Sequence, residues 1–383
     1  MGRTCSPRDS QQESRHVTYD QLFPILYQEL IDIYKSPQTP SSSNSLFGIE
    51  LTFTNDTLIE LARSENETDY KTYSTNLLNE WIEQVRLQYP FVHIGEFEKD
   101  SYGYVKVTLT LSSCDVILYL HSDDWVFEVG SSPMTSLALS KNLSTIQQIL
   151  FDTAVIIGLK PHDRIGGGHI HLDKQTNFGN DSILFRNFLV DLMNRPELFL
   201  GGLALDLLNA PPLAILSKEQ QEIFGEIIDE FDKSQLTIDA LCEVINRRVY
   251  YKSYISSTAS EMNSYNQHQS KYHAINLLHE QTIEIRGIHP QQSAQQLLCL
   301  MKLWEGRIEK LKHINKLILF EQKNLTDQVS WTVDRNIETY QVNIDPNIIE
   351  QCLADYIKDA GLQECYSTSD FRTSELSQRL INA

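Results

Sequence analysis

Four segments of the chain place charged or imidazole side chains among apolar neighbours. They are Glu50 in Gly48–Leu51, Glu128 in Val126–Val129, His169 and His171 in Gly168–His171, and Glu284 with Arg286 in Ile283–Arg286. A buried carboxylate is costly unless a cation, a metal or a proton neutralises it. Residues i and i+2 of a strand share a face. His169 and His171 therefore point to the same side of their strand, and so do Glu284 and Arg286. If the four segments meet on one sheet face, they form a site for a metal and a polyphosphate.

The side-chain types indicate which metal such a site would take. Oxygen ligands suit Mg²⁺, and an imidazole beside carboxylates favours Mn²⁺. Taken alone, each segment also has a simpler interpretation. Glu284 and Arg286 could form an internal ion pair, Glu128 could face solvent at a sheet edge, and the His-x-His pair could be structural. Gly166–Gly168 could be a plain hinge. The occurrence of all four segments in one chain favours the site.

The spacing of apolar residues predicts the elements that carry these side chains. Strands are expected at 46–53, 104–111, 115–121, 125–129, 169–173 and 282–286. Helices are expected at 74–88, 144–158, 183–195, 198–208, 219–231, 236–248, 292–320 and 346–359. Short polar turns between the strands indicate antiparallel neighbours. The prediction is an α+β fold, a curved antiparallel sheet with helices packed on its outer face.

Composition excludes several classes of protein. The 383 residues are 41% hydrophobic, which argues against a fully disordered or membrane-spanning chain. With 32 Lys and Arg against 51 Asp and Glu, the net charge of −19 argues against nucleic-acid binding. The six cysteines are scattered and lack the C-x-x-C spacing of zinc or redox sites. We expect them to be reduced, in a cytoplasmic protein with no transmembrane segment.

Changes in composition divide the chain into three parts. Residues 1–45 hold a polar start, an expected helix at 18–35 and a Pro/Ser linker; 46–318 form the main domain; and 319–383 are a mixed C-terminal extension. The main domain contains a helical insert at about 175–270, which we expect to cover the site or to shape the choice of substrate. The start also fits the pattern for N-myristoylation at Gly2, although a plain polar terminus is the simpler interpretation.

The charged segments resemble a known family, in the same order along the chain. Phe47–Phe53 is similar to the opening Gly-x-Glu-x-Glu-Phe strand of carboxylate–amine ligases with a glutamine-synthetase-like fold. Phe127–Pro133 resembles the Glu-x-x-Ser-x-Pro segment of their amidoligase branch, and Gly167–His171 resembles its Gly-x-His-x-His strand. Lys271–Leu277 followed by Thr282–Gly287 resembles Arg-Tyr-x-x-Leu-Asn-Leu and then Glu-Phe-Arg. The resemblance covers about residues 46–318 and implies a glutamine-synthetase-like catalytic domain.

The resemblance implies an activity and a role for each site residue. Such enzymes use ATP to phosphorylate a carboxylate, and an amine then attacks the acyl phosphate to give an amide or isopeptide bond. The implied ligands of Mg²⁺ or Mn²⁺ are Glu50, His169 and Glu284 for one ion and Glu128 for another. The implied contacts to ATP or substrate are Arg286, His171 and Asn276, with Gly167 and Gly168 letting the backbone approach the acid substrate. Glu50, Glu128 and Arg286 are therefore the expected catalytic residues.

The chain departs from the family pattern in places, and this keeps other functions open. Thr52 stands where the opening strand carries its second acid, and Lys271 stands where an Arg is usual. Glu128 has no evident partner, although Asp123 and Asp124 are candidates. The same fold also supports phosphotransferases, and a degenerate ligase scaffold could serve as a non-catalytic binding protein. The sequence does not identify the acid or the amine, each of which could be a small molecule or a protein side chain.

Overall fold

The computed structural model describes residues 45–64, 66–100, 103–111, 116–123, 125–162, 166–203, 210–234, 236–250, 273–334 and 337–372. The expected helix at 18–35, the linker up to residue 44 and Gly2 lie outside these residues. So do Lys271, Asp124 and the part of the expected helix 198–208 that follows residue 203.

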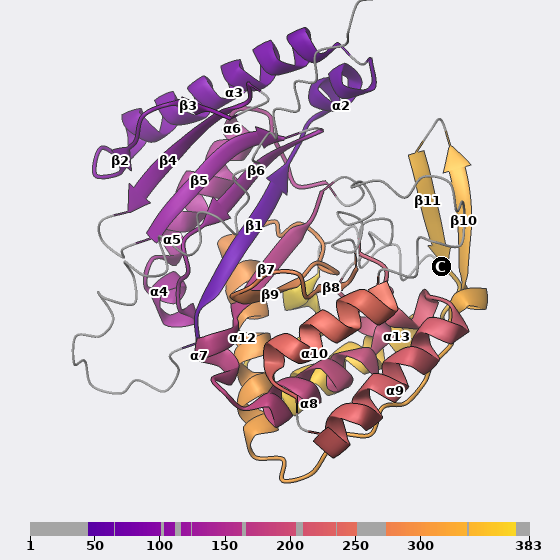
Figure 1. Cartoon of the computed structure of the whole chain (residues 1–383). Coiled ribbons are helices and arrows are strands. Elements are labelled where there is room, and N and C mark those ends of the chain that lie inside the picture. The colour runs from indigo at the N-terminus through magenta and orange to yellow at the C-terminus, as the bar shows by residue number, and fades with distance from the viewer. Residues whose placement is uncertain are drawn as a thin grey trace, which may run out of the picture.

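A nine-stranded sheet forms the centre of the described structure, in the order β2-β4-β5-β6-β1-β7-β9-β8, with β3 also pairing with β4 (Figure 1). Its strands are β1 (Phe47–Phe53), β2 (His93–Ile94), β3 (Glu98–Lys99), β4 (Val105–Leu111), β5 (Val116–Asp123), β6 (Val126–Ser131), β7 (Gly168–Asp173), β8 (Ile275–Asn276) and β9 (Thr282–Ile285). Every pairing in this part of the chain is antiparallel. The expected α+β fold with an antiparallel sheet is therefore confirmed.

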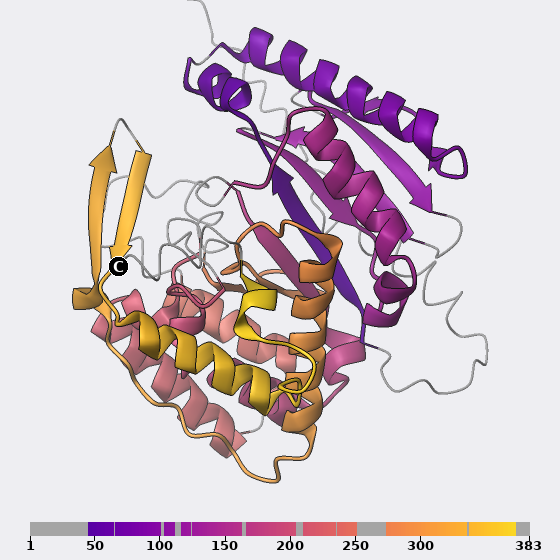
Figure 2. The same ribbon diagram turned by 180° about the vertical axis from the view of Figure 1, so that it is seen from behind.

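One face of the sheet is apolar and is covered by helices. Along β4 the burial alternates, so that the valines and leucines are buried and Lys106, Thr108 and Thr110 are half-buried on the other side. The buried side packs on α3 (Glu67–Gln88), whose Trp81 ring stacks on Phe127 with centroids 5.3 Å apart. Viewed from behind, α3 and the helical run of α5 (Leu143–Ile146), a π-helical turn and α6 (Thr153–Ile156) cross this face (Figure 2). The opposite, polar face of the sheet carries the charged and imidazole side chains of the candidate site.

The remaining helices lie mostly beside the β9–β8 end of the sheet (Figure 1). They are α2 (Asp56–Arg63), α4 (Ser136–Lys141), α7 (Lys174–Phe178), α8 (Ser182–Met193), α9 (Lys218–Ser234), α10 (Ile238–Ile245), α12 (Ala294–Lys312) and α13 (Pro346–Asp359), of which α2 and α4 lie elsewhere along the sheet. A hairpin of β10 (Val329–Asp334) and β11 (Ile337–Val342) stands apart from the main sheet. One hydrophobic cluster runs from Phe47 to Phe371, so α13 shares the core of the main domain.

The helix expected at 74–88 begins earlier, at Glu67, and two other expected helices differ more from the structure. The helix predicted at 292–320 ends at Lys312, because α8 binds the following segment as extended backbone: Asn187 bonds the amide of Ile318 at 3.0 Å and the carbonyl of Lys316 at 3.1 Å. The helix predicted from 198 is a series of turns up to residue 203, where Gly201 has a φ of 131° that interrupts a helix. Among the described residues, no helix combines the length and apolarity needed to span a membrane.

Candidate functional site

The register of β1, β7, β9 and β8 brings three of the four charged segments side by side, together with Asn276. Glu50 on β1 lies opposite His169 on β7, and His171 lies opposite Glu284 on β9. Asn276 on β8 lies opposite Glu284 from the other side. Because these residues alternate with the apolar ones that face the helices, their side chains lie on the polar face of the sheet.

Two carboxylates form the centre of the site. The Nδ1 atom of His169 lies 2.9 Å from Oε1 of Glu50 and 3.1 Å from Oε1 of Glu284. The Nε2 atom of His171 lies 3.5 Å from the other oxygen of Glu50. The guanidinium of Arg286 donates to Glu284 Oε1 at 2.7 Å. Residues from three strands and the loop after β9 thus meet around the two acids. We name this group of five residues the carboxylate centre: Glu50, His169, His171, Glu284 and Arg286.

Electrostatics keep both acids of the carboxylate centre ionised. Burial alone would raise the pKa of Glu284, but Arg286 and the neighbouring imidazoles hold it well below its usual range. Burial is opposed in the same way at Glu50, where His169 holds the carboxyl pKa well below its usual range. Burial and Arg286 would lower the pKa of His169, but Glu50 and Glu284 raise it. The centre therefore presents two carboxylates that favour a cation.

The donor set fits a divalent metal. Glu50, His171 and Glu284 each offer a ligand atom, and these three atoms lie within 4.8 Å of one another. Two carboxylates with an imidazole suit Mg²⁺ or Mn²⁺. His169, which the resemblance makes a ligand, bridges the two acids instead, and His171, expected to contact ATP or substrate, belongs to the compact group.

Sequence reasoning missed one member of the site, His279. It lies on the turn between β8 and β9, and its Nε2 atom lies 2.9 Å from Oε2 of Glu284. Asn276, for which the resemblance implies a contact to ATP or substrate, donates to the same oxygen at 2.7 Å. The sequence signal was weak, because a histidine five residues before Glu284 in a short turn has no strand periodicity to fix its direction.

Glu128 lies on the same face but outside the compact group. It pairs across β6 and β1 with Thr52, and Nδ1 of His121 lies 3.8 Å from its Oε1. Burial and the nearby charge of Glu50 raise the pKa of Glu128 well above its usual range. Asp123, at the end of β5, adds to this effect. A second cation near Glu128 would relieve this repulsion.

The glycines before β7 pack against the protein itself. A Cβ atom on Gly167 would lie 2.4 Å from Nε2 of His169, and one on Gly168 would lie 2.5 Å from the carbonyl of His289. Thr52 donates its hydroxyl to the Gly167 carbonyl at 2.9 Å. The space that the sequence assigned to substrate is thus partly filled by neighbouring residues, and Thr52 is engaged as a backbone partner.

Comparison of the chain with family models, with curated proteins and with solved structures finds no match.

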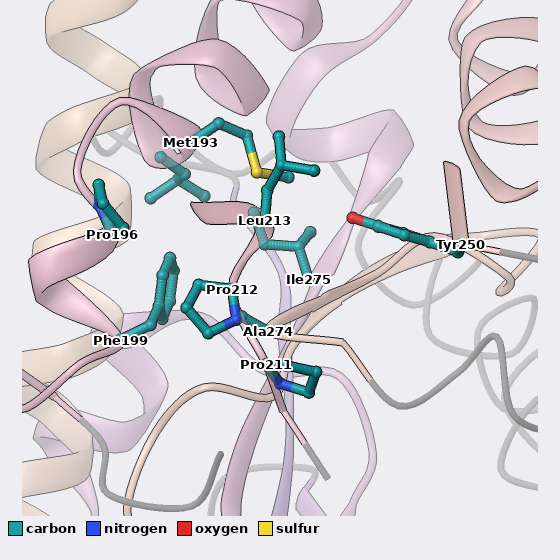
Figure 3. A pocket seen from close by; sticks show the side chains of 10 residues that line it. Met193, Pro196, Phe199, Pro211, Pro212, Leu213, Tyr250, Ala274 and Ile275 are labelled. Atoms are coloured by element: carbon teal, nitrogen blue, oxygen red, sulfur yellow. The ribbon is translucent and has the colours of Figure 1, made fainter. Parts of the chain in front are cut away.

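A small apolar cavity lies behind β8 and is separate from the carboxylate centre. Figure 3 shows Pro211, Pro212, Phe199 and Ile275 around it, with the hydroxyl of Tyr250 at one side. Ile275 directly precedes Asn276, so the two side chains point to opposite faces of β8. The cavity thus lies on the core side of the strand and offers no group to the polar face.

Proposed function

We propose that this protein is an ATP-dependent carboxylate–amine ligase of the amidoligase type, with a glutamine-synthetase-like fold. The observation that carries the proposal is the carboxylate centre, in which ligand atoms of Glu50, His171 and Glu284 lie within 4.8 Å of one another beside Arg286. The strands that carry the four motif segments are neighbours in the sheet, in the order β6-β1-β7-β9.

The proposed reaction has two steps. An oxygen of the substrate carboxylate attacks the γ-phosphorus of ATP, and ADP leaves with the bridging oxygen. The amine nitrogen then attacks the acyl carbon, inorganic phosphate leaves, and the amine loses a proton. Bound Mg²⁺ or Mn²⁺ supplies charge neutralisation for the phosphates.

The protein's own groups divide the remaining work. Glu50, Glu284 and His171 would hold the metal, and Glu128 would take a second ion. Arg286 is fixed by its 2.7 Å bond to Glu284 and supplies a guanidinium for a phosphoryl oxygen. His169, Gly167 and Gly168 shape the backbone next to the acid substrate. The buried surroundings strengthen each of these electrostatic contacts.

Calorimetric titration of Mn²⁺-ATP tests the proposal, with Mg²⁺-ATP as a second condition. We expect binding in the micromolar range, roughly −8 kcal/mol, to the wild type. Glu284→Gln should abolish it, whereas Glu280→Gln should not, because Glu280 is exposed on the same turn. If both variants still bound Mn²⁺-ATP like the wild type, the proposal would be contradicted.

Product analysis then separates ligation from phosphotransfer. With hydroxylamine as a general amine, a panel of carboxylic acids and ATP, a ligase releases phosphate and forms a hydroxamate. A phosphotransferase leaves a stable phosphorylated product and no hydroxamate.

A non-catalytic binding protein is the second candidate, and the engagement of Thr52 favours it. Its hydroxyl bonds Gly167 and so does not replace the missing acid as a ligand. Metal-dependent ATP binding without phosphate release for any acid and amine pair would support this candidate over the ligase.

A further inference from the structure

The turn between β8 and β9 carries an imidazole into the carboxylate centre. The Nε2 atom of His279 lies 2.9 Å from Glu284 Oε2 and 3.0 Å from the amide nitrogen of Asn276. Its ring also contacts the ring of His171, with centroids 5.1 Å apart at an interplanar angle of 67°. The side chain is 13% exposed, so most of the ring is enclosed by the protein.

A buried lysine holds this turn in place. The Nζ atom of Lys174 donates to the carbonyls of His279 at 2.9 Å and Glu280 at 3.0 Å. The backbone amide of Lys174 donates to the carbonyl of Gln281 at 2.9 Å. Lys174 directly follows β7, the strand that carries His169 and His171. The segment that carries His169 and His171 thus also holds, through Lys174, the turn that carries His279.

We propose that His279 is a further metal-binding side chain, and that the carboxylate centre selects a first-row transition ion such as Mn²⁺ over Mg²⁺. Two acids alone would favour Mg²⁺, which prefers oxygen ligands and retains its waters. His171 lies 3.5 Å from Glu50, and His279 lies 2.9 Å from Glu284. Two imidazoles beside these acids shift the preference toward ions that accept nitrogen. The inference rests on the proposed function for the task of the metal, but metal binding alone tests it.

The experiment titrates full-length, metal-free protein with Mn²⁺ in the absence of ATP, and follows free Mn²⁺ by electron paramagnetic resonance. Competition of Mg²⁺ against bound Mn²⁺ gives the affinity for Mg²⁺. We expect the wild type to bind Mn²⁺ at least tenfold more tightly than Mg²⁺. His279→Gln should weaken Mn²⁺ binding by about 10- to 100-fold and Mg²⁺ binding much less, which narrows the selectivity. His313→Gln is the matched control, because that side chain is 74% exposed at the end of α12.

Two further measurements distinguish coordination of the metal by His279 from a merely structural role of this side chain. Pulsed resonance on bound Mn²⁺ counts coupled imidazole nitrogens, and the count should fall by one in His279→Gln. Lys174→Met keeps His279 but removes the ammonium that donates to the carbonyls of His279 and Glu280, so it should weaken Mn²⁺ binding less than His279→Gln does. If His279→Gln does not fold, His279→Asn and the nitrogen signal of the wild type carry the test.

The outcomes separate this inference from the proposed function. Equal Mn²⁺ affinity and nitrogen count in the wild type and in His279→Gln would overturn the role of His279. If Glu284→Gln still abolished Mn²⁺-ATP binding in that case, the proposed function would stand. Absence of Mn²⁺ binding by the wild type, with or without ATP, would overturn both.

Discussion

Glu50 and Glu284 stand on strands that are not neighbours, yet a single nitrogen atom joins their carboxylates. That atom is Nδ1 of His169, at 2.9 Å from one acid and 3.1 Å from the other, and it lies on the strand between them. In the absence of metal, a protonated imidazole at this point neutralises part of the charge that a cation would otherwise balance.

Replacing this bridging imidazole should destabilise the metal-free protein. His169→Gln leaves the buried carboxylate of Glu284 and the half-buried one of Glu50 near each other without their shared cation, and we expect a loss of about 3 kcal/mol in the free energy of unfolding. Urea unfolding at neutral pH with a chelator measures it. Saturating Mn²⁺ should recover part of the loss by binding the folded state. His121→Gln on the same face should cost less than about 1 kcal/mol, because its 3.8 Å pair with Glu128 is partly exposed. Equal losses in the two variants would contradict this account.

Thr52→Val tests whether the hydroxyl of Thr52 is structural or a ligand. The variant removes the 2.9 Å bond to the Gly167 carbonyl, which retains the 3.2 Å bond from the Thr52 amide. We expect a cost of about 1 kcal/mol in unfolding free energy and an unchanged Mn²⁺ affinity. Thr52→Ser keeps the hydroxyl and serves as the control. A marked loss of Mn²⁺ affinity in Thr52→Val would make Thr52 a ligand instead.

Gly168→Ala should be destabilising because there is no room for a methyl group. The new Cβ would lie 2.2 Å from the side-chain nitrogen of Gln291 and 2.5 Å from the backbone carbonyl of His289. We expect a loss of about 2 kcal/mol by thermal or urea unfolding. Gly225→Ala in α9 is the control, since its nearest contact would be an ordinary 3.5 Å to Phe320, and it should stabilise by up to about 1 kcal/mol. The prediction fails if both variants behave alike.

His289 should make the protein sensitive to mild acid. Burial lowers the pKa of His289 from 6.5 to about 4, although its bond to the Leu203 carbonyl opposes this. As the pH falls below 6.5, the unfolded chain binds a proton that the folded protein does not, so stability falls until about pH 4. The contribution is about 3 kcal/mol over this range, at about 1.4 kcal/mol per pKa unit.

The measurement is the pH dependence of urea unfolding for the wild type and His289→Gln. The variant should have a shallower slope between pH 6.5 and 4, whatever its stability at neutral pH. Parallel slopes would show that His289 titrates normally in the folded state.

Local patterns were sufficient to predict β1, β4, β5, β6, β7 and β9, but not the two-residue strands β2, β3 and β8 or the β10–β11 hairpin. Lys106, Thr108 and Thr110 alternate with valines and leucines, and this period alone identifies β4 and its two faces. The same holds for α13, which was predicted at 346–359 and spans Pro346–Asp359. Its start is marked by Asp345 as cap and by Pro346 in the first turn.

Features set by distant contacts could not be predicted. Helix α12 stops at Lys312 although apolar residues continue in phase, because side chains of α8 bind the backbone beyond it. The direction of His279 depends on Lys174, more than a hundred residues earlier in the chain. The partner of Thr52 depends on where β7 begins relative to β1. Each of these depends on contacts between residues far apart in the chain, which no local pattern contains.

The sheet order also determines when the site can exist. Glu50 belongs to the first strand of the described chain and Glu284 to the ninth, with β7 between them in space. During synthesis, more than two hundred residues are added after Glu50 before Glu284 is available to complete the site. Pairings this distant in sequence form slowly, and partly made sheets with open edges are prone to aggregate. Binding of the proposed metal would therefore report that the last central strand has been inserted, and it would stabilise the sheet only from that stage on.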